Sequence, residues 1–224
     1  ANGVEYTYYQ PTEDSTDARV MSIAQAIAEG ADTIVMPGYL FGATLTMVMQ
    51  EYPDVKFIAL DVAKGDLLEG GVAMKGEAYD YNPDNWNLTD YVYMDNVYCA
   101  IYQEELSGYM AGYAAVKLGY TKLGFLGGMA VPAVIRYGYG FVQGADAAAA
   151  ELNKDIEIKY TYGGQFQGSP EITAKMEGWY QNGTEIVFAC GGGIYTSALD
   201  AAKKTDGAKL IGVDVDQSYI DPAY

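Results

Sequence analysis

Residues able to bind a small molecule stand where several predicted strands end. They are aromatic rings, carboxylates and glycines: Tyr39, Phe41, Phe166, Asp61, Asp214, Gly191 and Gly192. Rings can stack on a planar ligand, carboxylates can accept hydrogen bonds from sugar hydroxyls or ring N–H groups, and glycines let backbone amides approach closely. Ligands of doubly wound sheets bind outside the carboxyl ends of the strands, so we expect a binding site there. Its segments are 38–41, 61, 127–129, 164–166, 191–193 and 214–217.

Each of these positions has a simpler alternative. A single glycine can be explained by turn geometry alone. Asp214 could cap a helix instead of binding a ligand. The pair Gly127-Gly128 precedes a predicted helix and would shape the edge of a cleft more than it would grip a ligand.

The sequence does not contain a known catalytic device. It has no histidine, the commonest general base and metal ligand. No serine lies in a G-x-S-x-G motif, and the glycines match neither G-x-G-x-x-G nor a P-loop. Glu104 and Glu105 are adjacent and point in different directions, so they do not form a paired-carboxylate acid/base device. For Cys99 and Cys190, a buried free thiol is favoured over a disulfide or a nucleophile. We therefore expect no catalytic residue, no metal and no cofactor.

Charge restricts the possible partners. The net charge is −17 over 224 residues, and no Lys/Arg cluster reverses it, so nucleic acid would be repelled. No apolar stretch reaches the roughly 18 residues that a membrane-spanning helix requires. The N-terminal segment ANGVEYTYYQ lacks the basic and apolar regions of a signal peptide, so we expect an exported protein to have lost its leader.

Strands and helices alternate along nearly the whole chain. Period-two or apolar runs predict strands at 4–10, 32–38, 55–61, 91–98, 122–128, 156–163, 184–190 and 209–216. Helical spacing and capping residues predict helices at 15–30, 43–54, 102–119, 132–152, 169–183 and 196–205. This order predicts an α/β fold with parallel sheets covered on both faces.

Two such α/β segments indicate two lobes. We place their boundary near Tyr120, which gives lobes at 1–120 and 121–224. Residues 63–90 interrupt the alternation, and a long segment without its own structure is often functional or mobile. We interpret it as a surface insertion or, alternatively, a lid.

Several longer segments resemble a known family. They are 103–151 (QEELSGYMAGYAAVKLGYTKLGFLGG and onward), 178–193 (GWYQNGTEIVFACGGG) and 210–217 (LIGVDVDQ), preceded in order by PGYLF and EYPDVKFIALD. Together they resemble the basic membrane protein family of substrate-binding lipoproteins. Its best-described branch comprises purine nucleoside receptors that serve ABC transporters.

The resemblance implies a type I periplasmic-binding-protein fold, with two Rossmann-like lobes that close on a ligand. It implies an extracytoplasmic location, lipid-anchored at the cell membrane or periplasmic, with the transporter permease as partner and a lipid anchor upstream of this sequence. It also implies that Phe166 stacks on a purine, that Gly191 and Gly192 bring backbone near the ligand, and that Asp214 holds the sugar hydroxyls. The family's opening strand, its D-x-S-F-N segment and its return to the first lobe are not matched, so we expect a chain truncated at both ends.

Three alternatives to a nucleoside receptor stay open at this point. One is a receptor for another small solute, such as a sugar or a lipid-like signal. A second is an α/β enzyme that uses Asp61 or Asp214 with a metal, although the missing histidines and phosphate loops count against it. The third is the ligand-sensing domain of a transcription regulator.

Overall fold

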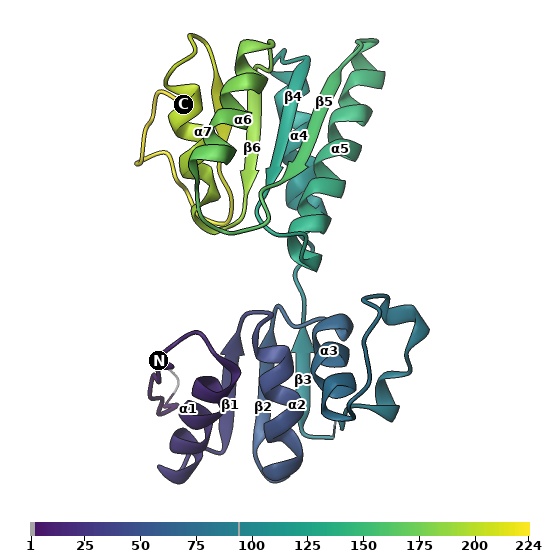
Figure 1. Ribbon diagram of the computed structural model, residues 1–224, viewed down its shortest axis with the longest axis vertical. Coiled ribbons are helices and arrows are strands. Elements are labelled where there is room, and N and C mark those ends of the chain that lie inside the picture. Colours follow the sequence, from purple (N-terminus) through teal and green to yellow (C-terminus); the bar gives the residue numbers. More distant parts are fainter. Residues whose placement is uncertain (1–2, 94) are drawn as a thin grey trace. The chain divides into compact units, whose positions relative to one another are not determined.

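A computed structural model of the chain describes residues 3–93 and 95–224. It divides into two compact units, Ala1–Tyr102 and Gln103–Tyr224. Each unit contains one sheet in which every strand pair is parallel, with helices packed on it (Figure 1). The predicted α/β architecture with two lobes and parallel sheets is therefore confirmed.

The first unit buries one face of its sheet. The strands are β1 (Thr33–Pro37), β2 (Lys56–Leu60) and β3 (Val97–Ala100), in that spatial order. The helices are α1 (Thr16–Ala28), α2 (Phe41–Glu51), α3 (Lys64–Met74) and the short 3-10 helices η1 (Pro83–Asn85) and η2 (Leu88–Asp90). Alternate residues of β1, Ile34 and Met36, enter the core, while Val35 between them is 57% exposed. The prediction of a sheet covered on both faces is therefore wrong for this unit, because α1, α2 and α3 contribute to one shared core.

The second unit does bury both faces. Its strands are β4 (Lys122–Gly127), β5 (Glu157–Tyr162), β6 (Ile186–Cys190) and β7 (Lys209–Ile211), in the order β5-β4-β6-β7. Its helices are α4 (Glu104–Lys117), α5 (Pro132–Leu152), α6 (Pro170–Gln181), α7 (Tyr195–Ala202) and the 3-10 turn η3 (Gly192–Ile194). Phe125 and Phe188 join the core under α4 and α5. Their sequence neighbours Leu126 and Val187 point to the other face and join the core under α6 and α7. Figure 1 shows the two helix pairs on opposite faces of this sheet.

Helix α4 belongs to the second unit, so the division falls after Tyr102 and not near Tyr120. The reason is a close contact between α4 and α5. A Cβ atom added at Gly112 would lie 2.0 Å from the carbonyl oxygen of Phe141, and one added at Gly144 would lie 1.9 Å from that of Tyr109. Backbone therefore meets backbone across this interface, which fixes α4 against α5.

Three predicted strands differ in the structure. The strand predicted at 209–216 is reduced to β7 (Lys209–Ile211), and the residues that follow it turn, with the amide of Val215 donating to Val213 O at 2.8 Å. Residues 4–10 form no strand, because the side chains on one side of the alternation (Val4, Tyr6 and Tyr8) are largely exposed and, within residues 3–93 and 95–224, no strand pairs with them. Of the strand predicted at 91–98, only residues 97 and 98 belong to a strand, β3, which continues to Ala100, and Tyr91 ends η2 in a turn. Position 94 of that prediction lies outside the described residues.

The segment 63–90, which we interpreted as an insertion or a lid, contains helix α3. The sequence did not predict this helix because it contains several glycines, which lower helix propensity. The structure gives one of them a packing role. A Cβ atom added at Gly70 would lie 2.7 Å from the Cα of Ala43 and from the hydroxyl of Thr46, both on α2. The helix is therefore part of the first unit's framework, and only the residues after Met74 form an irregular surface segment.

Candidate functional site

The carboxyl ends of β4, β5 and β6 are tied together by backbone hydrogen bonds. The amide of Gly128 donates to Cys190 O at 2.8 Å, and the amides of Gly163 and Gly164 donate to Gly127 O and Gly128 O at 2.8 and 3.0 Å. The amide of Gly128 and the carbonyl oxygens of Gly127 and Gly128 are thus all occupied by neighbouring backbone. This supports its predicted role in shaping the edge of the site.

Phe166 lies on a floor of glycines at this edge. Its half-buried ring is so close to the backbone that a Cβ atom at Gly128 would lie 2.5 Å from the ring, and one at Gly191 would lie 3.0 Å from it. The amide of Gly193 donates to Phe166 O at 2.7 Å. Gly191 and Gly192 have φ values of 134° and 52°, which side chains other than glycine rarely adopt. The structure therefore brings Phe166, Gly191 and Gly192 together.

Asp214 follows β7 at the same edge of the sheet. It is exposed, with a φ of 67°. The hydroxyl of Tyr137, on α5, donates a hydrogen bond of 3.2 Å to its Oδ1. The Tyr137 ring meets Phe188 edge to face, with 6.0 Å between ring centroids. Burial, followed by the negative charge of Asp214, raises the pKa of Tyr137, so its hydroxyl remains a donor at neutral pH. Asp214 caps no helix among the described residues.

Sequence reasoning missed Tyr137, although a signal was present. Val134 and Phe141 are buried, and Tyr137 lies between them at helical spacing on α5. A tyrosine on the core-facing stripe of the helix that follows a strand-end turn can reach toward the carboxyl edge of the sheet.

The two cysteines offer no reactive thiolate. Both are free thiols; Cys190 is buried and Cys99 is half-buried. Burial, followed by the charges of Asp214 and Glu104, raises the pKa of the Cys190 thiol, which opposes formation of the nucleophilic thiolate. Glu104 is itself buried and forms a 2.6 Å ion pair with Arg136. Within residues 3–93 and 95–224, no group of three or more acidic or cysteine side chains could hold a metal.

The first unit carries the other predicted residues. Tyr39 follows β1 and Asp61 follows β2, and both are half-buried. Burial raises the pKa of Tyr39, with smaller contributions from Asp14, Asp66 and Asp61, so these groups lie near one another. Phe41 begins α2 and packs against the core. The centroid of its ring lies 5.8 Å from the guanidinium carbon of Arg19. Its environment therefore gives Phe41 a packing role.

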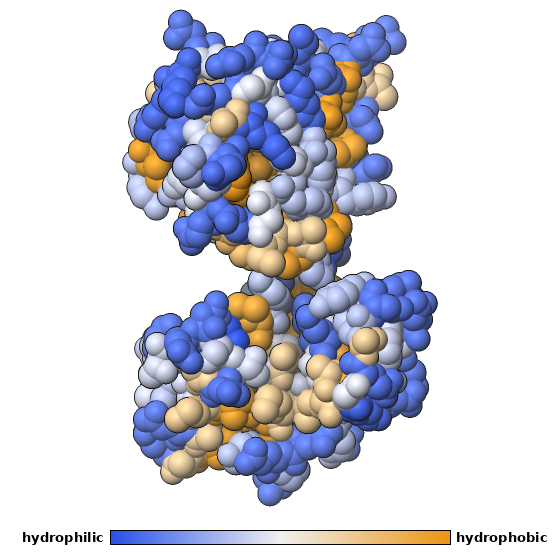
Figure 2. Space-filling view, viewed as in Figure 1, coloured by the Kyte–Doolittle hydropathy of each residue, from blue (hydrophilic) through white to orange (hydrophobic). Residues whose placement is uncertain are grey.

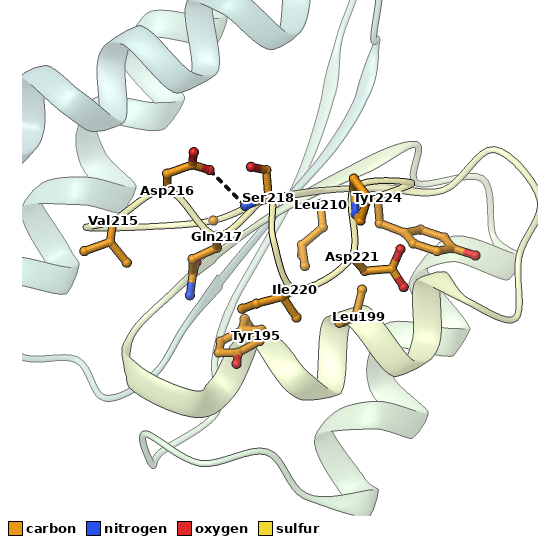
Figure 3. A pocket seen from close by; sticks show the side chains of 12 residues that line it. Tyr195, Leu199, Leu210, Val215, Asp216, Gln217, Ser218, Ile220, Asp221 and Tyr224 are labelled. Carbon is orange, nitrogen blue, oxygen red and sulfur yellow. Dashed lines mark hydrogen bonds between the residues drawn. The ribbon is translucent and has the colours of Figure 1, made fainter.

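A separate pocket of about 370 Å³ lies between α7 and the C-terminal segment of the second unit. Figure 3 shows Tyr195 and Leu199 on α7 facing Leu210 and Ile220 across it. Two of its carboxylates are engaged within the protein: Asp216 accepts from the amide of Ser218 at 2.9 Å (Figure 3), and Asp221 pairs with Lys203 at 3.1 Å. None of the seven predicted site residues lines this pocket.

Figure 2 shows that hydrophilic residues cover much of the visible surface of the second unit, in keeping with the net charge of −17. The lower edge of that unit in this view, where β4 and β6 end, is less hydrophilic. An edge with a ring, glycines and one carboxylate can stack a planar group and accept hydrogen bonds from hydroxyls. Among the described residues, no helix has the length and apolarity needed to cross a membrane.

Comparison with known proteins assigns the chain to a family. The family model Bmp, described as "ABC transporter substrate-binding protein PnrA-like", matches residues 1–224. The Lactococcus lactis "ABC transporter nucleoside-binding protein BmpA" is 33% identical over 150 residues, which cover 62% of this chain and 42% of that protein. "Basic membrane protein B" of Borreliella burgdorferi is 29% identical over 198 residues, covering 86% and 49%. The chain thus spans about half the length of the curated relatives it matches.

Solved structures share the fold at lower identity. A solute-binding protein of an ABC transporter from Aeropyrum pernix K1 is similar with a TM-score of 0.65 and 22% identity, covering 94% of this chain and 54% of that one. A transcriptional activator of the comK gene from Bacillus halodurans also gives a TM-score of 0.65, at 17% identity, covering 92% and 60%. At these identities the likeness concerns the fold alone.

Proposed function

This chain belongs to the Bmp family of PnrA-like ABC transporter substrate-binding proteins, and from that premise we propose that it binds a purine nucleoside for import. The substrate-binding protein would deliver its ligand to a membrane permease. The expected location is extracytoplasmic, with a lipid anchor or in a periplasm. The protein acts as a receptor and leaves its ligand chemically unchanged.

One observation carries the proposal: an aromatic face and an exposed carboxylate occupy the same carboxyl edge of the second unit's sheet. A purine is planar and apolar on its faces, which suits stacking on Phe166. A ribose presents neighbouring hydroxyl donors, which suits the carboxylate of Asp214. The name of the Lactococcus lactis relative, a nucleoside-binding protein, agrees with this assignment.

Tyr39 and Asp61 are the candidate ligand-binding residues of the first unit. Both follow strands at the carboxyl edge of its own sheet, where the amide of Gly38 donates to Leu60 O at 2.8 Å and the amide of Asp61 donates to Ala100 O at 2.7 Å. A carboxylate and a phenol in this position can accept and donate hydrogen bonds to the edge of a base. We assign Phe41 a smaller part, because its ring already packs against the core and Arg19.

The test is calorimetric titration of the complete gene product with purine nucleosides, the matching free bases, and a panel of sugars. We expect binding of at least one purine nucleoside, with free bases weaker and sugars weaker still. A ligand at 100 times its Kd stabilises the folded protein by about 2.7 kcal/mol, so thermal unfolding provides an independent readout. Tight binding of a sugar with no response to any nucleoside would replace the proposed ligand with a sugar.

A further inference from the structure

We propose that Tyr137 is a positioning residue that holds Asp214 ready for the ligand's sugar and so makes the site favour nucleosides over free bases. This inference rests on the proposed function, because it assumes that Asp214 meets the ribose. It assigns a role to a residue that lies on a different element from the predicted site residues. The contact that supports it is the 3.2 Å hydrogen bond from the Tyr137 hydroxyl to Asp214 Oδ1.

The Tyr137 ring is held firmly enough to serve as a reference point. It lies on α5 between the buried residues Val134 and Phe141, and its edge-to-face contact with Phe188, on β6, anchors it to the sheet. Helix α5 is fixed in turn by its close contact with α4. The hydroxyl therefore projects from a rigid part of the second unit toward a residue in a less regular one.

Asp214, by contrast, has little else to orient it. It is exposed, adopts a left-handed φ of 67°, and lies in the segment after β7, which contains no further helix or strand. Within residues 3–93 and 95–224, Tyr137 is the only side chain found to hydrogen-bond its carboxylate. An ionised carboxylate has about four acceptor positions. Tyr137 takes one of them and leaves the others for hydroxyl donors.

Preorganisation gives this contact an effect on binding. A free carboxylate must lose rotational freedom when it meets the ribose, whereas one already held by Tyr137 loses less. The cost of immobilising one such side chain corresponds to about a 2- to 10-fold change in affinity. A free base has no ribose, so its affinity gains nothing from an oriented Asp214. The ratio of nucleoside to base affinity therefore measures the contribution of Tyr137.

The experiment is calorimetric titration of the Tyr137→Phe variant of the complete gene product with a purine nucleoside and its free base. Phenylalanine keeps the ring against Phe188 and removes only the hydroxyl. We expect nucleoside affinity to fall about 2- to 10-fold and base affinity to stay within error of the wild type. Tyr139→Phe is the matched control, since Tyr139 lies on the same helix and is 64% exposed; it should change neither affinity. In an Asp214→Asn background, Tyr137→Phe should cause no comparable further loss.

The outcomes separate this inference from the proposed function. If Asp214→Asn weakens nucleoside binding and Tyr137→Phe does not, the inference fails and the function stands. If Tyr137→Phe weakens nucleoside and base equally, its role is structural and the inference fails. If the wild type binds no nucleoside, the proposed function fails and the inference falls with it. Because affinities are compared as a ratio, partial unfolding of a variant, which lowers the number of active sites, does not mimic the expected result.

Discussion

Replacing Gly112 with alanine should destabilise the second unit, although helix propensity alone predicts the opposite. Alanine favours a helix over glycine by about 1 kcal/mol, so the intrinsic effect is stabilising. The added Cβ would, however, lie 2.0 Å from Phe141 O and 2.9 Å from the amide nitrogen of Ala145. The first distance is 1.4 Å short of ordinary contact at 3.4 Å. The obstacle is backbone, so no side chain can rotate away and α4 must separate from α5.

Overpacking of this kind costs roughly 1–3 kcal/mol, and the backbone obstacle places Gly112→Ala at the upper end of that range. After subtraction of the helix-propensity gain, the net loss should be about 2 kcal/mol. Gly178→Ala is the matched control, because Gly178 lies inside α6 with nothing within 4 Å of an added Cβ. It should stabilise the same unit by about 0.5–1 kcal/mol.

Urea unfolding can isolate the second unit. The sequence has two tryptophans, Trp86 in the first unit and Trp179 in the second. In a Trp86→Phe background, fluorescence reports only on Trp179, which lies beside Gly124 of β4. Gly112→Ala should lower the midpoint, and Gly178→Ala should raise it. Equal or greater stability for Gly112→Ala would refute the close contact between α4 and α5 and, with it, the placement of α4 in the second unit.

Further predictions concern the ligand and pH. Asp214→Asn should weaken nucleoside binding by about 1.5–3 kcal/mol and Phe166→Leu by about 0.5–1.5 kcal/mol; calorimetry with nucleoside and base checks this, and an equal loss for both ligands in Asp214→Asn would contradict the ribose assignment. Incubation with a nucleoside should release no free base or deaminated product, and chromatographic detection of product in proportion to protein would disprove a purely binding role. Burial alone would raise the pKa of Glu185, but backbone hydrogen bonds from Thr121 and Lys122 hold it below its ordinary value. Its contribution to stability is therefore present above the unfolded pKa of about 4.3 and lost as the pH falls through the folded value. Acidification should destabilise the wild type more than the Glu185→Gln variant. If the urea midpoints of the two proteins fall by the same amount as the pH is lowered, this prediction is contradicted.

Helix α5 shows what the sequence can predict. Its predicted bounds match the structure because Pro132 occupies its first turn and Asn153 ends it in a left-handed conformation, with φ 48°. Strands β4 and β6 were equally predictable, since their continuous burial demands unbroken apolar runs. Strong local signals of this kind depend little on what the rest of the chain does.

The predictions failed where contacts between distant parts of the chain determine the local structure or the role of a residue. Glycine lowers helix propensity, so residues 63–90 suggested a loop, yet Gly70 lies in α3 because α2 passes too close for any side chain. Residues 4–10 alternate like a strand, but no strand in the described part of the chain pairs with them. The helical spacing of Tyr137 on α5 does not by itself select it among 22 tyrosines, because its role depends on Asp214, which lies 77 positions away in the sequence.

Glycines at the candidate site act differently from those between helices, and the sequence alone does not distinguish them. Between α4 and α5 they let backbone meet backbone, whereas Gly128 and Gly191 let backbone meet a ring. A Cβ atom at Gly128 would lie 2.5 Å from Phe166, and Phe166 would have to move to accommodate it. The position of the aromatic face is thus determined by the glycine floor beneath it. A ligand stacked on Phe166, as we propose, would therefore be affected by both glycine positions, even where their own amides donate to other residues, as the amide of Gly128 does to Cys190 O.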